Sequence, residues 1–267
     1  MIITWGEVFN VNFEVVLREK YLENPCLFQP TALWKTVKMT SDFKKEIKVN
    51  NNEVVYLIIE NESMLHTYWF SSEYSIYPKI KDNYEMMILH ENFMDKFNTV
   101  NFIDEKYFKL IHNLKNIHKE ELNRRFSFQT VNIPREADIV SDIICKCYTD
   151  IRVTTEEVLE WTKEKVFDNS LWVLVVDNIK EMPIALGIAE CDEDIMEGSL
   201  EWIQVLPQYR GYGIGVALVN FLLLILKEKS KFVTVSGKID NKTNPQRMYR
   251  KCGFQGNDIW HILRRKL

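Results

Sequence analysis

The chain has 267 residues, which is long for one domain and suits two. Hydrophobic residues make up 46% and charged residues 27%, so the composition excludes extended disorder. The formal net charge is -4 with both signs scattered along the chain, which argues against nucleic acid as the main partner because phosphate binding leaves a basic footprint.

The cysteines and the ends of the chain give no sign of a metal site or of export. Five cysteines occur at irregular spacing, without a Cys-x-x-Cys pair or a nearby histidine, so we expect reduced thiols, no metal and a cytoplasmic protein. The N-terminus lacks the basic region of a signal peptide. The longest apolar stretch, 214–226, is interrupted by Asn220 and is too short to span a bilayer, so no membrane association is expected.

The first part of the chain shows few clear elements. Val54–Ile59 and Leu65–Phe70 have the residue content of strands. The apolar residues of Phe108–Leu122 predict an amphipathic helix. We interpret residues 1–125 as a smaller α+β domain that precedes a second domain, 126–267.

From Phe126 onward, strands and helices alternate. Strands are predicted at 126–133, 171–176, 184–190, 200–205, 232–235 and 259–263, and helices at 135–148, 154–165, from the glycine turn to about 229, and 244–251. Thr154 begins a sequence that resembles a capping box, and Gly253 suits the position just after the last helix. This order favours an α/β fold (mixed α+β) whose sheet is at least partly parallel.

A glycine-rich turn follows the strand at 200–205. Gly211, Gly213 and Gly215 allow a ligand to approach the backbone closely. The N–H groups at the start of the next helix have no intrahelical partners, and the helix dipole adds partial positive charge there. The turn therefore predicts a phosphate site, to which Arg210 adds a cation. The P-loop and dinucleotide-binding patterns are both absent.

The complete string is more specific than its glycines. The sequence V-x-P-x-x-R-G-x-G-I-G-x-A-L over 205–218 resembles the acetyl-CoA motif of the GNAT superfamily of N-acetyltransferases. The family signature falls on Arg210, Gly211, Tyr212, Gly213, Ile214 and Gly215. A second segment, Met248–Phe254, is similar to the family's L-Y-x-x-x-G-F segment. The resemblance covers about residues 126–267 and implies a GNAT-like central mixed sheet flanked by helices.

The resemblance also implies how the cofactor binds. Acetyl-CoA would place its pyrophosphate on the loop 210–215, beside a sheet that splays open at the strand 200–205. Ile203, Gln204 and Val205 would contact the cofactor, with backbone groups of Ile203 and Val205 pairing with the pantetheine arm. The N–H near Val205 would polarise the acetyl carbonyl.

One position departs from the family pattern. The family commonly has an asparagine seven residues before the tyrosine of the second segment, where this chain has Lys242. Asn241 and Asn244 flank it, and either could contact the cofactor.

Two catalytic residues are implied. An acceptor amine with a pKa of about 10.4 arrives charged at neutral pH, so a carboxylate should help to remove its proton. Glu201 is the leading candidate, with Glu190 and Asp192 as alternatives, although a strand glutamate can also be merely solvated or ion-paired. Tyr249 would donate to the departing thiolate. Full proton transfer is uphill by roughly 2 kcal/mol, because a phenol is a weaker acid than a thiol.

The sequence thus predicts an acetyl-CoA-dependent N-acetyltransferase that acts on a small-molecule or peptide amine, as a monomer or homodimer. A regulatory protein that binds acetyl-CoA without turnover and an acyltransferase for a longer chain are the alternatives. Residues 1–125 could be a degenerate GNAT-like half or a separate substrate-recognition module. Because only Gly6 precedes Gly187, they hold no second glycine loop. The acidic run 191–197 could attract a cationic amine or form a solvated hairpin.

Overall fold

The computed structural model describes residues 12–39, 41–71, 83–119, 122–148 and 150–266. The chain forms two compact units, one made of 1–108 with 258–267 and the other of 109–257. The last strand therefore leaves the second unit and completes the first. The functional division into 1–125 and 126–267 stays a prediction.

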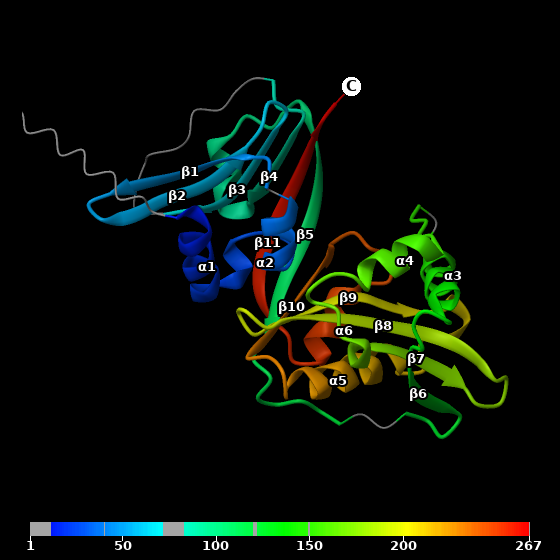
Figure 1. Cartoon of the computed structure of the whole chain (residues 1–267). Helices are drawn as coiled ribbons and strands as arrows, with labels where there is room; N and C mark the ends of the chain where they lie inside the picture. The colour runs from blue at the N-terminus through cyan, green and yellow to red at the C-terminus, as the bar shows by residue number, and fades with distance from the viewer. Residues whose placement is uncertain (1–11, 40, 72–82, 120–121, 149, 267) are drawn as a thin grey trace, which may run out of the picture. The chain divides into compact units, whose positions relative to one another are not determined.

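The second unit contains the elements that the sequence predicts between Phe126 and Lys251, whereas the predicted strand 259–263 belongs to the first unit (Figure 1). Its strands are the end of β5 (Phe102–His112), β6 (Phe126–Thr130), β7 (Trp172–Asp177), β8 (Met182–Asp192), β9 (Glu197–Val205) and β10 (Phe232–Lys238). Its helices are α3 (Ala137–Cys147), α4 (Thr155–Trp161), α5 (Ile214–Leu226) and α6 (Pro245–Lys251), with short 3₁₀ turns η3 (Asn169–Leu171) and η4 (Pro207–Tyr209).

Local signals account for two of these helices. Thr154 and Glu157 form the predicted capping box at the start of α4, each side chain accepting from the other's backbone N–H. The helix ends at Trp161, one turn before the predicted end. Asn244 caps the start of α6, and Gly253 has a φ of +93° just after it, a conformation that favours glycine.

Helices cover both faces of the second unit's sheet (Figure 1). Strands β6 to β9 pair antiparallel in sequence order, and β10 then pairs parallel with β9. A Cβ added to Gly187 would lie 2.9 Å from Leu218 and Leu222, so α5 packs closely on the face of β8 that carries this glycine. Helix α5 also contacts β9, and α3 packs on β8 and β9 from the other face. This is the predicted mixed sheet flanked by helices.

The first unit repeats part of this order. It contains α1 (Phe13–Glu23), the 3₁₀ turn η1 (Pro25–Leu27), α2 (Leu33–Met39), β1 (Lys44–Asn50), β2 (Glu53–Glu60), β3 (Met64–Phe70), β4 (Met86–His90), η2 (Glu91–Lys96), the first residues of β5 and most of β11 (Gln255–Arg265). Strands β1, β2 and β3 pair antiparallel, and β4 then pairs parallel with β3. An antiparallel succession followed by one parallel pair is thus common to both units.

The predicted helix at Phe108–Leu122 is wrong. Residues up to His112 belong to β5, and the described residues after it form no helix. Phe108, Leu110 and His112 share one face of this strand and are buried, and Lys109 on the other face is buried as well. Leu114 then has a φ of +61°, which no helix tolerates. The apolar residues of this segment fit both periods, and pairing within the sheet decided between them.

Among the described residues, none of the helices is long and apolar enough to cross a membrane.

Candidate functional site

The glycine loop joins β9 to the N-terminus of α5. Gly211 has a φ of +88° and Gly213, the N-cap of α5, a φ of +77°. A Cβ added at either residue would meet no atom within 4 Å. Both positions therefore favour glycine for their backbone conformation, and the space beside each is open to a ligand.

Gly215 has a different role in the structure. It lies in the first turn of α5, where an added Cβ would come within 2.7 Å of the Sδ atom of Met248. The glycine lets α6 pack tightly against α5. Met248 precedes Tyr249 in α6, so this contact also fixes the position of Tyr249 beside the loop.

The sheet opens beside β9. Parallel pairing between β9 and β10 runs only from Glu197 with Phe232 to Leu200 with Val235, although both strands continue beyond it. At the same place β9 contains a bulge, because Leu200 and Trp202 pair with consecutive residues of β8. Glu201 is the extra residue of this bulge. A bulge bends its strand, and the two strands part at this point.

The register shows which backbone groups face the opening. The N–H of Leu206 donates to the carbonyl of Ile184 at 3.0 Å, so the neighbouring pair of Val205 with Ala185 is a non-hydrogen-bonded one. The N–H and C=O of Val205 therefore point away from β8. The same alternation applies to Ile203, and both residues present their backbone groups toward the side where β10 has diverged.

Gln204 lies between them and is used differently. It occupies a hydrogen-bonded position opposite Leu186, so its backbone groups belong to the β8 ladder. Its side-chain Nε2 donates to the hydroxyl of Tyr148 at 3.0 Å, which connects β9 to the C-terminal end of α3.

Arg210 lies across the strand end. Its Nε donates to the carbonyl oxygen of Val205 at 3.1 Å, and its side chain is exposed. It also acts on the thiol of Cys147, whose pKa is raised by burial and partly lowered again by the charge of Arg210. Tyr212 is 62% exposed, with its ring edge-on to Phe126 at 6.2 Å, whereas Ile214 is buried.

The surroundings of Tyr249, one of the two predicted catalytic residues, change its acidity. Tyr249 is buried in α6, with its ring 5.7 Å from that of Phe254. Burial raises the pKa of Tyr249 above its ordinary range, and the groups of Tyr148, Cys252 and Glu201 raise it further. Of these causes burial has the largest effect on the pKa and Glu201 the smallest.

The alternative carboxylates have other partners. Glu190 accepts from the hydroxyl of Ser199 at 3.5 Å. Asp192 accepts from the backbone N–H of Asp194 at 3.0 Å, within the hairpin that the acidic run forms between β8 and β9. Of the three carboxylates, only Glu201 lies at the bulge where the strands part.

The two asparagines shape the turn before α6. Asn241 accepts from the N–H and the hydroxyl of Thr243 at 3.0 and 2.8 Å. Asn244 has a φ of +47° and accepts from the N–H of Arg247 at 3.4 Å as the helix cap. Their side-chain oxygens thus hold the backbone of this turn.

An aromatic cluster beside β9 has no sequence signature. Trp202 stacks on Trp161 of α4 with ring centroids 5.7 Å apart and planes at 14°, and Tyr148 meets Trp202 edge-on at 6.1 Å. All three side chains are partly exposed. Because they come from three separate elements, residue spacing could not have predicted the cluster.

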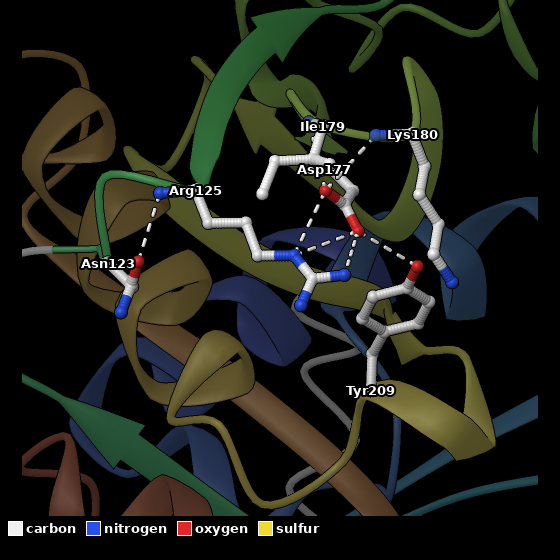
Figure 2. A network of polar contacts seen from close by, with 6 residues as sticks. All are labelled: Asn123, Arg125, Asp177, Ile179, Lys180 and Tyr209. Carbon is white, nitrogen blue, oxygen red and sulfur yellow. Dashed lines mark hydrogen bonds and ion pairs between the residues drawn. The ribbon is translucent and has the colours of Figure 1, made fainter.

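A second group that sequence reasoning missed surrounds Asp177 at the end of β7. This fully buried carboxylate accepts from the guanidinium of Arg125, from the hydroxyl of Tyr209 at 3.0 Å, and from the backbone N–H groups of Ile179 and Lys180. Figure 2 shows the side chains of Arg125 and Tyr209 both directed at the carboxylate. Arg125 holds the pKa of Asp177 well below its usual range.

A glycine turn at a helix start, beside a parallel strand pair that opens, defines a class of α/β proteins able to bind a phosphate together with an extended chain. Residues 168–256 match the family model described as an acetyltransferase (GNAT) domain, which confirms the resemblance found in the sequence. None of the curated proteins matches the chain.

Solved structures show the same fold over most of the chain. A GCN5-related N-acetyltransferase from Sphaerobacter thermophilus has a TM-score of 0.65 at 12% identity, covering 88% of this chain and 85% of that one. A GNAT-family acetyltransferase from Colwellia psychrerythraea has a TM-score of 0.64 at 13% identity, covering 95% and 96%. A tandem GNAT protein from the clavulanic acid biosynthesis pathway has a TM-score of 0.57 at 9% identity, covering 98% and 96%. The tandem match is consistent with two GNAT-like halves in this chain.

Proposed function

We propose that the protein is an N-acetyltransferase that uses acetyl-CoA and transfers the acetyl group to a primary amine by direct attack in a ternary complex. The observation that carries this proposal is the open backbone edge of β9 beside the glycine loop. Ile203 and Val205 present backbone groups to the gap left by β10, and the loop at Gly211 and Gly213 lies at the end of the same strand.

The residues present fit acetyl-CoA. The open space at Gly211 and Gly213 and the N-terminus of α5 suit a pyrophosphate, because N–H groups without helical partners and a partial positive charge meet there. The edge of β9 suits an amide-containing arm, which can pair with it as a strand would. When bound, the cofactor supplies the activated acetyl group.

The proton of the acceptor amine goes to Glu201, directly or through one water. Only the neutral amine has the lone pair that forms the new C–N bond, so a carboxylate next to the reacting carbonyl promotes attack. Glu201 is partly exposed and lies at the bulge of β9. The N–H of Val205 polarises the carbonyl as the bond forms.

Tyr249 assists the leaving thiolate as a hydrogen-bond donor. Its raised pKa keeps the phenol protonated, so the donor is present across the working pH range. The same shift makes complete proton transfer to sulfur more uphill than for an ordinary tyrosine. The departing thiolate would take its proton from solvent. A charged acceptor loses two protons in all: one passes through Glu201 to solvent before attack, and the second, lost as the C–N bond forms, offsets the proton that the sulfur would take.

The acceptor is a primary amine of a small molecule or a peptide. The partly exposed rings of Tyr148, Trp161 and Trp202 lie beside β9, where they can contact the organic part of the acceptor. A protein that binds acetyl-CoA without turnover would use the same loop, so turnover has to be measured directly.

Titration calorimetry with acetyl-CoA tests the cofactor site. We expect micromolar binding by the native protein, with Gly213→Asp weakening it by at least about a hundredfold because a carboxylate would face the pyrophosphate. Gly213→Asn is the matched control, since asparagine has the same size and tolerates positive φ without the charge. It should retain most of the affinity.

Release of free thiol from acetyl-CoA across a panel of primary amines then tests transfer. Amine-dependent release supports the enzyme. Binding without release by any amine would favour the regulatory alternative, and no binding by the native protein would contradict the proposed function.

A further inference from the structure

Tyr209 connects the buried charge of Asp177 to the glycine loop. It is the last residue of η4, one position before Arg210, and its ring is buried. Its hydroxyl donates to Asp177 at 3.0 Å, a hydrogen bond between elements 32 residues apart in the sequence. A bond to a charged acceptor is among the stronger neutral-donor contacts in proteins. The start of the loop is thus tied to the end of β7.

The aromatic rings extend this connection to the other side of the loop. Phe126 meets Tyr209 edge-on and Tyr212 edge-on, both at 6.2 Å. The guanidinium of Arg125 lies 5.4 Å from the Phe126 ring and 5.8 Å from the Tyr209 ring. Arg210 and Gly211 therefore lie between two tyrosines that rest on the same phenylalanine.

Resting on the proposed function, we propose that Arg125, Asp177 and Tyr209 form a brace that holds the backbone of the loop in its phosphate-binding conformation. Tyr209 is then a positioning residue, which acts on the cofactor through the loop and does not touch the reacting atoms.

The charge of Arg125 offsets that of Asp177. A buried carboxylate close to a phosphate site would repel the ligand, and the effect would be strong because burial weakens screening. The guanidinium forms two bonds to Asp177 through Nε, at 3.0 and 3.1 Å, and a further one through Nη2. The pair is neutral overall, so the brace keeps a charged acceptor for Tyr209 without opposing an anionic ligand.

Tyr209→Phe tests the brace, because it removes the hydroxyl that Figure 2 shows directed at Asp177 and keeps the ring in contact with Phe126 and Arg125. Ser127→Ala is the matched control. Its hydroxyl, in β6, donates at 2.7 Å to Asn178, the residue after Asp177, so this bond lies beside the brace and does not include the loop. Amide hydrogen exchange without cofactor should become severalfold faster at 210–213 in Tyr209→Phe, while exchange in the buried part of α5 stays unchanged in this variant. In Ser127→Ala, exchange at 210–213 should stay as in the native protein.

Cofactor titration gives the second measurement. Tyr209→Phe should bind acetyl-CoA roughly tenfold more weakly than the native protein, raising KM for acetyl-CoA with little change in kcat. In an Asp177→Asn background the same substitution should add much less, because the two residues act as a pair.

The two measurements separate the brace from the proposed function. Unchanged exchange at 210–213 in Tyr209→Phe would overturn the brace, whatever the protein binds. Faster exchange in α5 as well would also overturn it, because the effect would then be general destabilisation. Failure of the native protein to bind acetyl-CoA, with faster exchange confined to the loop, would overturn the proposed function and leave the brace supported.

Discussion

The Nε of Arg210 donates to the carbonyl oxygen of Val205 at 3.1 Å, so one residue connects the predicted phosphate loop to the predicted pantetheine strand. This bond uses one of the five N–H donors of the guanidinium, and the positive charge of the group remains next to the loop. The same side chain can therefore fix the strand end and attract an anion.

Arg210→Gln separates these two roles, because glutamine can still donate to Val205 but carries no charge. We expect acetyl-CoA affinity to fall about tenfold and to depend less on salt than in the native protein. Calorimetry at low and high salt measures both effects. Lys163→Gln, which removes an exposed cation two residues after α4, is the control and should leave them unchanged. Equal salt dependence in Arg210→Gln would exclude a contact between this charge and the cofactor.

Tyr249→Phe should lower kcat by roughly ten- to a hundredfold with little change in the dissociation constant for acetyl-CoA. Because burial raises the pKa of the phenol, Tyr249 stays protonated through the ordinary range of tyrosine titration. Ionisation of this phenol should therefore cause no loss of native activity near pH 10. The outcome against this expectation is a loss near pH 10 in the native protein that Tyr249→Phe does not show. Such a loss would mean that the phenol ionises in that range.

Glu201→Gln should reduce kcat/KM most strongly around neutral pH, where the acceptor amine is charged and needs a base to take its proton. Removing its charge should also lower the pKa of Tyr249. Glu190→Gln is the matched control, because Glu190 lies in β8 and accepts from Ser199. A larger loss in Glu190→Gln than in Glu201→Gln would transfer the role of base to Glu190.

Asp177 should make stability depend on pH. Its pKa is lower in the folded protein than in the unfolded chain, so its contribution is complete above the unfolded value of about 4 and is lost as pH falls below it. The difference in free energy of unfolding between the native protein and Asp177→Asn should therefore shrink between pH 7 and pH 3. Urea unfolding at both values measures it. Asp142→Asn, which breaks an exposed pair with Lys146, should show almost no such change.

Trp260 should be the most costly large residue to truncate in the first unit. It is 1% exposed in β11, and its Nε1 donates to the carbonyl of Cys26 at 2.8 Å. Trp260→Ala should destabilise this unit by about 3–5 kcal/mol through lost packing. Trp260→Phe keeps part of the ring but leaves the carbonyl of Cys26 without this donor, so its stability should lie between those of the native protein and Trp260→Ala. A cost below about 1 kcal/mol for the alanine variant would contradict the packing seen here.

Local signals were the most reliable guide to the fold. The strands and helices after Phe126 follow from periodicity and caps, because these depend on residues close together in the sequence. Phe108–Leu122 was misread because its apolar residues fit two periods, and only pairing within the sheet separates them. The sequence also did not predict that the last strand belongs mostly to the first unit. This placement depends on contacts such as that of Asp258 with His90, which are 168 residues apart.

By itself, the sequence determined the glycine loop and the family of the second part of the chain. Both are written in consecutive residues, and the conformations of Gly211 and Gly213 depend on their missing side chains. Only the tertiary structure decided which other groups meet the loop. It placed Glu201 in a bulge, where its charge adds to the raised pKa of Tyr249, and Tyr209 on the buried Asp177. These pairs join strands and helices distant in sequence, and their contacts arise from packing and register, which local patterns do not specify.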